Sequence, residues 1–244
     1  MREKDTPVAN PTIQDVLDTF LEEQCRRLSA RTYAHYSQVV NLLLACLNLW
    51  GHESLSDAET ERFKQLRRTD AGGGREFCDL FGPEHILAHL DHFLGEFMIR
   101  KVLGGGDLKR AAGTVTGAVV AWLVEKGHVS VRKAKDAAKT CDAASRNIPR
   151  AEDLALRMTV FAQEQDASVE ERVEDLFTFT SVQPSWVWVR GMKDNRPLGP
   201  IDLPEDICSL CRVDWMITAV LGRVGRKWQF IEAWNVYPRE YGGV

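Results

Sequence analysis

The sequence predicts an α+β protein made of several parts, with helices in its first two-thirds and a small β domain at its C-terminal end. Apolar residues recur at helical spacing as far as about residue 165 of the 244-residue chain. At Phe177 the pattern changes to the alternation typical of strands. Hydrophobic residues make up 44% of the chain and charged residues 27%, which is sufficient for a buried core.

Two helices are expected at the start of a helical domain that covers residues 10–130, after a disordered tail at 1–9. The first helix begins after Thr12, whose hydroxyl can cap the free N–H groups of the first turn. The second and longer helix follows Ser29 and ends near Gly51. A polar stretch with no assigned helix comes next.

Two further helices complete a four-helix bundle. The third opens with a proline in its first turn and lies between glycine runs at 72–74 and 104–106, which predict loops. The fourth spans about 107–126. Its two internal glycines, Gly113 and Gly117, would allow another backbone to approach closely.

A helical connector with an acidic end is expected at 131–175. Its two helical segments are Ser130–Asn147 and Pro149–Gln165, separated at the proline. Residues 151–176 hold 2 Lys+Arg against 8 Asp+Glu, whereas the whole chain has a net charge of −4. The chain therefore lacks the basic excess that is typical of strong non-specific DNA-binding proteins.

The C-terminal segment 176–244 predicts a small β barrel or roll of the SH3-like or OB-like kind. The loop Met192–Pro200 interrupts the strands, which are expected at Phe177–Thr180, Trp186–Arg190, Val213–Leu221 and Lys227–Tyr237.

The expected strand Trp186–Arg190 carries apolar residues on both of its faces. Trp186, Trp188 and Arg190 share one face, and Val187 and Val189 share the other. Exposed tryptophans beside an arginine would form a stacking platform for single-stranded nucleic acid. A domain this small needs aromatic residues in its core, so we expect most of its tryptophans to lie inside.

Four segments of the chain carry a family resemblance. Residues 28–36, Leu-Ser-Ala-Arg-Thr-Tyr-Ala-His-Tyr, resemble the opening of the second helix in the core-binding domain of the tyrosine recombinase (phage integrase) family. Residues 12–21, 82–90 and 122–129 are similar to other helices of that domain. The segments occur in the family's order and cover roughly residues 10–130.

The resemblance implies a SAM-like four-helix bundle that grips double-stranded DNA. It implies that Arg31, Thr32 and His35 lie near phosphates at the start of the second helix. Lys109 and Arg110 would do the same at the start of the fourth. The alternative is that Arg31 and Thr32 only cap and solvate a helix.

The segment Ser130–Lys139 is a locally positive run of the sequence. Arg132 and Lys133 could follow a phosphate backbone. The alternative, which we favour, is that the run packs against the acidic segment Glu164–Asp175 of the same chain.

We expect no enzymatic activity and no cofactor. Recombinase chemistry requires a Tyr nucleophile together with Arg, His and Lys groups that hold and protonate the phosphate. No His of this chain is followed by Arg three positions later, and the late tyrosines Tyr237 and Tyr241 lack such partners.

Two further groups of residues could bind a metal ion or take part in redox chemistry. His85, His89 and His92 would share one stripe of a helix, a weak candidate metal site for which a solvated polar face is favoured. Cys208 and Cys211 form a lone CxxC motif and are expected to be buried as small apolar residues.

The first hypothesis for function is a non-catalytic DNA-binding or DNA-associated, integrase-like protein connected with DNA recombination. The alternative is a protein-interaction adaptor whose bundle no longer contacts DNA and whose acidic connector or β domain binds a protein partner. No signal peptide is visible, and Ala111–Val124, the longest apolar stretch, is too short to span a membrane. We therefore expect a cytoplasmic protein without membrane contact.

Overall fold

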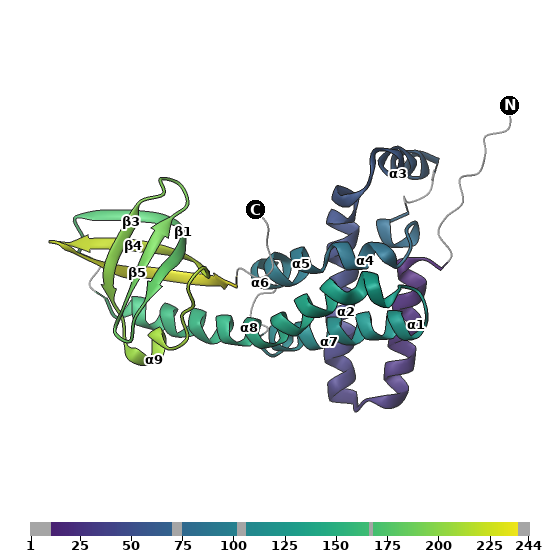
Figure 1. Ribbon diagram of the computed structural model, residues 1–244, viewed down its shortest axis with the longest axis horizontal. Helices are drawn as coiled ribbons and strands as arrows, with labels where there is room; N and C mark the ends of the chain where they lie inside the picture. Colours follow the sequence, from purple (N-terminus) through teal and green to yellow (C-terminus); the bar gives the residue numbers. More distant parts are fainter. Residues whose placement is uncertain (1–10, 70–74, 102–105, 166–167, 239–244) are drawn as a thin grey trace. The chain divides into compact units, whose positions relative to one another are not determined.

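The computed structural model describes residues 11–69, 75–101, 106–165 and 168–238, and it has an α+β fold in which helices precede an antiparallel sheet (Figure 1). The predicted tail at 1–9 and the glycine run at 72–74 lie outside the described residues. The chain divides into two compact units. Unit 1 consists of Met1–Phe97 and Arg110–Ser145, and unit 2 consists of Met98–Lys109 and Arg146–Val244. This division differs from the domain boundaries expected from the sequence.

The first two helices of unit 1 form where their capping residues indicate. In α1 (Ile13–Arg27), the Thr12 hydroxyl accepts a hydrogen bond from the Asp15 N–H, and the Asp15 carboxylate accepts one from the Thr12 N–H. This contact lowers the pKa of Asp15. In α2 (Ala30–Trp50), Ser29 is the N-cap residue and Gly51 the C-cap residue, as predicted.

The polar stretch after α2 contains a helix that the sequence analysis did not assign. It is α3 (Asp57–Thr69). Ser56 precedes it, and Glu59 accepts hydrogen bonds from both the backbone N–H and the hydroxyl of Ser56. This S-x-x-E pattern is a capping signal that was present in the sequence.

The predicted third helix is divided into short pieces. They are α4 (Glu84–Ala88), α5 (Leu90–His92), a π-helical turn at Phe93–Phe97 and, in unit 2, α6 (Met98–Lys101). The break between α4 and α5 lies at His89, whose φ of −110° and ψ of 0° are not helical. Ile86, Leu90 and Phe93 of this segment are buried in the core.

Helices α7 (Gly106–Glu125) and α8 (Val131–Gln163) follow, and their parts in unit 1 pack closely together. A Cβ atom at Gly113 would clash with the backbone of Ser145, so the predicted close approach is confirmed there. The predicted break at Pro149 is wrong, because α8 continues through it. A proline removes one backbone hydrogen bond but need not end a helix whose side chains are buried on both sides of it.

Unit 2 contains a five-stranded antiparallel sheet with the strand order β3-β2-β1-β4-β5. Leu154 and Met158 of α8 belong to the same apolar core as Phe177, Phe179 and Phe230 of the sheet. The elements of this unit are β1 (Glu171–Val182), β2 (Trp186–Gly191), β3 (Pro197–Asp202), α9 (Glu205–Cys208), β4 (Met216–Val224) and β5 (Lys227–Tyr237).

The prediction of a closed barrel is wrong. Edge strands β3 and β5 are linked by the ion pair between Lys227 Nζ and Asp202 Oδ2, at 2.8 Å, and the sheet is not closed by backbone pairing between them. Two further boundaries differ from those expected. Strand β3 begins inside the predicted loop Met192–Pro200, and β1 begins inside the predicted connector.

Candidate nucleic-acid interface

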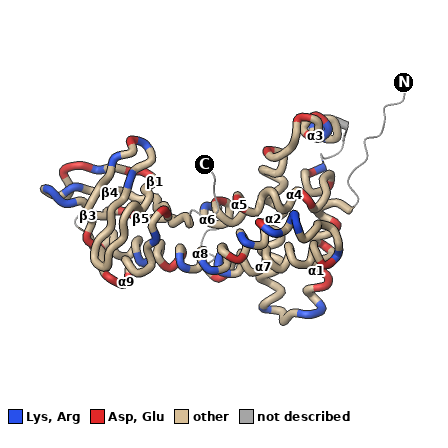
Figure 2. Tube along the Cα trace, in the orientation of Figure 1, with Lys and Arg blue, Asp and Glu red and all other residues tan. Residues whose placement is uncertain are grey.

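Three arginines gather at the corner between α1 and α2, where Figure 2 shows Lys and Arg positions at the turn. Arg26 and Arg27 lie in the last turn of α1, and Arg31 lies in the first turn of α2. All three are exposed. Within the described part of the chain none of them forms an ion pair, and Arg27 contacts only the amide oxygen of Gln24, at 3.5 Å. We call these three residues the corner arginines.

The first turn of α2 adds a second feature that favours anions. Ser29 accepts a hydrogen bond from the Thr32 N–H at 3.3 Å, and the hydroxyls of Ser29 and Thr32 lie 2.9 Å apart. The earlier N–H groups of a helix have no intrahelical partner and carry the positive end of its dipole. Thr32 is exposed and His35 is partly buried one turn further on.

The corner is held in place by contacts between α1 and the end of α7. Glu23 accepts a hydrogen bond from Trp122 Nε1 at 2.8 Å and forms an ion pair with Lys126 at 2.7 Å. These contacts lower the pKa of Glu23, and the same ion pair raises the pKa of Lys126. Phe20 packs edge-on against the ring of Trp122. The last turn of α1, and with it the corner, is therefore fixed against the bundle.

Lys109 does not belong to this surface, so its expected phosphate contact is not supported. Its side chain is only 8% exposed, and its Nζ lies 2.8 Å from Glu152 and donates to the Ile99 carbonyl at 3.3 Å. Its ammonium group is therefore already paired with a carboxylate. Arg110, the next residue, is exposed and belongs to unit 1.

The basic run at the start of α8 is divided between two faces of the helix. Arg132 and Lys135 border a groove against α7, whereas Lys133 lines a second hollow beside Asp136. All three cations are exposed and form no ion pair within the described residues. The ion pairs of the described chain give no support to packing of this run against the acidic segment Glu164–Asp175.

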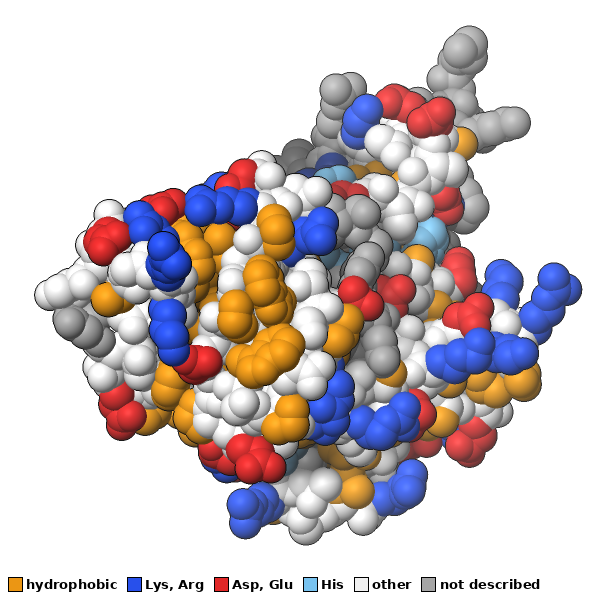
Figure 3. All heavy atoms as spheres, turned by 60° about the vertical axis from the view of Figure 1, so that its left-hand side comes forward, with side chains coloured by type: hydrophobic (Ala, Val, Ile, Leu, Met, Phe, Trp, Pro, Cys, Tyr) orange, Lys and Arg blue, Asp and Glu red, His pale blue; other side chains and the backbone are white. Residues whose placement is uncertain are grey.

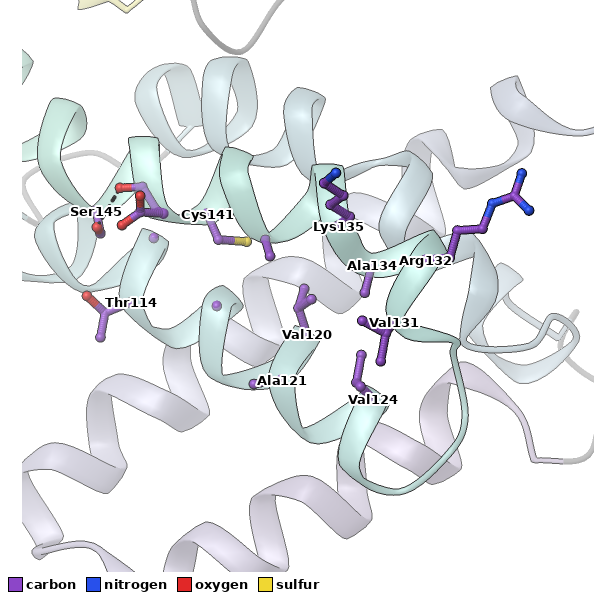
Figure 4. A pocket seen from close by; sticks show the side chains of 14 residues that line it. Thr114, Val120, Ala121, Val124, Val131, Arg132, Ala134, Lys135, Cys141 and Ser145 are labelled. Atoms are coloured by element: carbon purple, nitrogen blue, oxygen red, sulfur yellow. Dashed lines mark hydrogen bonds between the residues drawn. The ribbon is translucent and has the colours of Figure 1, made fainter.

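The groove between α7 and α8 has a volume of about 1040 Å³ and lies entirely within unit 1. Figure 4 shows Val120, Val124 and Val131 facing it, while the charged ends of Arg132 and Lys135 point away from its floor. Val131 is 73% exposed, which is unusual for a β-branched apolar side chain.

The three histidines of the predicted stripe do not share an exposed face. His89 is buried, and its ring nitrogens each lie 3.2 Å from a carbonyl oxygen, of His85 and of Trp50. The ring of His92 packs beside Trp50, and its Nδ1 lies 3.6 Å from Glu96. The expected solvated face is wrong because the helix breaks at His89. No group of three or more His, Cys, Asp or Glu residues in the described chain is arranged to hold a metal ion.

The cysteines of the CxxC motif are buried, as predicted. Cys208 is the last residue of α9 and Cys211 follows one turn later, and their Sγ atoms face the carbonyls of Leu203 and Ile207. Burial raises the pKa of Cys211 to about 12 and also raises that of Cys208. Both thiols are therefore poor nucleophiles.

The expected orientation of β2 is wrong. Val187 and Val189 are fully buried in the core, whereas Trp186 and Trp188 are partly exposed on the opposite face of the sheet and Arg190 is exposed. Trp215 and Trp228 are buried as expected, and Trp234 is 40% exposed.

Arg26 and Arg27 were not among the DNA-contacting residues predicted from the sequence. The signal was present in the sequence, since Arg26-Arg27-Leu-Ser-Ala-Arg31 places three cations within six residues.

Comparison of the chain with protein-family models, with curated proteins and with solved structures found no match. Among the helices that the structure describes, none combines the length and the apolar character needed to cross a membrane.

Proposed function

We propose that this chain is a non-catalytic protein that binds double-stranded DNA through the corner between α1 and α2. The corner arginines contact phosphates, and the first turn of α2 presents its N–H groups to the same backbone. Arg132, Lys133 and Arg110 supply further contacts from unit 1. The resemblance of residues 28–36 to the tyrosine recombinase core-binding domain supports the same surface, because Arg31 lies in that segment.

The observation that carries the proposal is that the corner arginines are exposed and form no ion pair within the described chain. An arginine already paired with a carboxylate must lose that partner before it binds a phosphate, whereas these three need not. Three exposed arginines can neutralise three phosphates. Each neutralised phosphate releases condensed counterions and so adds to the affinity.

The test is fluorescence anisotropy of a labelled DNA duplex titrated with the full chain at low salt. We expect binding by the wild type and a loss of at least about tenfold in the Arg26→Ala/Arg27→Ala/Arg31→Ala variant. The matched control is Arg172→Ala/Arg212→Ala/Arg226→Ala, which removes the same charge from exposed positions of unit 2. Equal losses in the two variants would attribute binding to net charge alone and refute the proposed surface.

A second candidate function, a protein-interaction adaptor, is favoured by the groove between α7 and α8. Its apolar floor and exposed Val131 fit the apolar face of one partner helix. The variant Ala121→Arg/Ala138→Arg places charges at two exposed positions of the groove lining. If the chain is an adaptor, this variant loses its partner in co-purification and the corner variant keeps it. DNA binding predicts that the groove variant leaves duplex affinity unreduced.

A further inference from the structure

The outer face of the sheet in unit 2 is apolar and aromatic although it is turned away from the core. Strand β2 directs its valines inward and places Trp186 and Trp188 outward. The backbone pairing then defines one row across the sheet, in which Arg190 lies opposite Thr178, Thr178 opposite Met216, and Met216 opposite Tyr237.

Trp234 belongs to the same face. Strand β5 carries an irregularity between the partners of Ile217 and Ala219, so that both Trp234 and Asn235 lie between the inward residues Ala233 and Val236. We use the name aromatic face for Trp186, Trp188, Met216, Trp234 and Tyr237. Figure 3 shows hydrophobic side chains gathered on unit 2, with Lys and Arg side chains along their border.

The aromatic face is long enough for a run of unpaired nucleotides. Strands β2, β1, β4 and β5 are neighbours in the sheet, so three spacings of about 4.8 Å place roughly 14 Å between the outer two. The register also offsets Trp186 from Trp234 along the strands, by about six residues or roughly 20 Å. Domains of this kind that bind single strands cover roughly 4–16 nucleotides. The ring of Trp188 is itself supported from below, since a Cβ atom at Gly199 would lie only 2.9 Å from it.

Cations border the β2 side of the aromatic face, whereas the exposed carboxylates of Glu174 and Glu232 lie beyond Trp234 on the same side of the sheet. Arg190 contacts only the amide oxygen of Asn195, at 3.3 Å, and Lys193 Nζ donates to the Glu174 carbonyl, so neither cation is paired with a carboxylate in the described chain. The carboxylate opposite Trp186 in the register, Asp202, is neutralised by Lys227 at 2.8 Å. Bases that stack on Trp186 and Trp188 would thus bring their phosphates towards cations that have no carboxylate partner.

We propose that the aromatic face binds single-stranded nucleic acid by stacking its bases on Trp186, Trp188 and Trp234, with Arg190 and Lys193 bound to phosphates. This surface lies in unit 2 and is independent of the duplex-binding corner of unit 1. Base stacking would account for the apolar rings on the outer side of the sheet, since the core on the other side is already filled by Phe177, Phe179 and Phe230.

The test is anisotropy of labelled oligothymidylate with the full chain. Trp186→Ala and Trp234→Ala are each expected to weaken binding at least about fivefold, because a stacked base contributes about 1–3 kcal/mol. Arg190→Ala weakens it severalfold and Arg226→Ala, an exposed arginine in the turn between β4 and β5, leaves it unchanged. Trp186→Phe retains a ring and restores most of the affinity, which separates stacking from a loss of folding.

Three outcomes would overturn the proposal. They are absence of oligothymidylate binding by the wild type, equal binding by the tryptophan variants, and a shift from dimer to monomer on sedimentation of Trp234→Ala without any nucleic-acid binding. The last result would assign the face to a second copy of this chain. The corner variant Arg26→Ala/Arg27→Ala/Arg31→Ala should retain oligothymidylate binding, so failure of the duplex proposal can be told apart from failure of this one.

Discussion

Arg31 and Lys109 occupy equivalent places in two long helices, yet their surroundings differ completely. Arg31 lies in the first turn of α2, exposed and without an ion pair in the described chain. Lys109 lies in the first turn of α7, buried against Glu152 of α8 and the Ile99 carbonyl of α6. The first is free to bind a ligand, whereas the second links three elements of unit 2.

The difference shows that a cation at a helix start has no fixed role. A partner distant in the sequence decides it, because a buried ammonium group must be paired and hydrogen-bonded. Lys109 has such a partner 43 residues away in the chain. Substitutions at the two helix starts should therefore affect different properties of the protein.

The largest expected effect is on stability at the start of α7. Glu152→Ala would leave the Lys109 ammonium buried without a carboxylate, and we expect it to lower the free energy of unfolding by about 3 kcal/mol. Urea denaturation of the full chain measures this. Arg31→Ala, on the exposed helix start, should change the stability by less than about 0.5 kcal/mol. Equal effects of the two substitutions would contradict the comparison.

A smaller effect is expected in the middle of α7. Gly113→Ala adds a Cβ atom that meets the Ser145 backbone, so α7 and α8 must move apart at a cost of about 2 kcal/mol. Gly117→Ala is the matched control, because its Cβ would lie 3.5 Å from Cys141 at an ordinary contact distance. The control should be neutral or stabilising, since alanine is the better helix former. Thermal denaturation of both variants distinguishes close packing from helix propensity.

The smallest effect is a dependence of unit 1 stability on pH. Burial lowers the pKa of His85, whose ring contacts Phe77 and Phe81, although Glu84 and Glu59 act in the opposite direction. The unfolded chain therefore binds more protons at this site than the folded chain does. The contribution of His85 to stability is present above its unfolded pKa of about 6.5 and is lost as the pH falls below it. Melting temperatures between about pH 7 and pH 5 should fall less for His85→Gln than for the wild type.

Much of the helical part could be predicted from the sequence because its signals are local. Thr12 and Ser29 cap α1 and α2, and apolar residues at helical spacing define the buried faces of both helices. The break at His89 could not be predicted, since the apolar period continues through it into the π-helical turn. At Pro149 the sequence predicted a helix break that is absent from the structure. The local helix-breaking effect of the proline is outweighed there by the packing of α8.

The sheet was harder to predict, because alternation indicates a strand but not which face is buried. Both faces of β2 carry apolar side chains, so the sequence pattern alone does not decide whether the valines or the tryptophans enter the core. Strand β3 was missed because its two prolines and a glycine are typical of loops. A proline is compatible with a strand at the edge of a sheet, and β3 is such an edge.

The candidate site was predictable only in part. Arg31 was predicted because it lies in the segment 28–36 that resembles the recombinase core-binding domain. Arg26 and Arg27 join the same surface because α1 ends, and α2 begins, at the same corner of the fold. The loss of Lys109 from the set depends on its contact with Glu152, which no local pattern indicates.

The most direct test of the central claim is the salt dependence of duplex binding by the wild type and by the Arg26→Ala/Arg27→Ala/Arg31→Ala variant. If the corner arginines contact three phosphates, the slope of the logarithm of affinity against the logarithm of salt concentration becomes shallower by about 2.7 in the variant. An unchanged slope, or no duplex binding by the wild type even at low salt, would contradict the claim that this corner binds DNA.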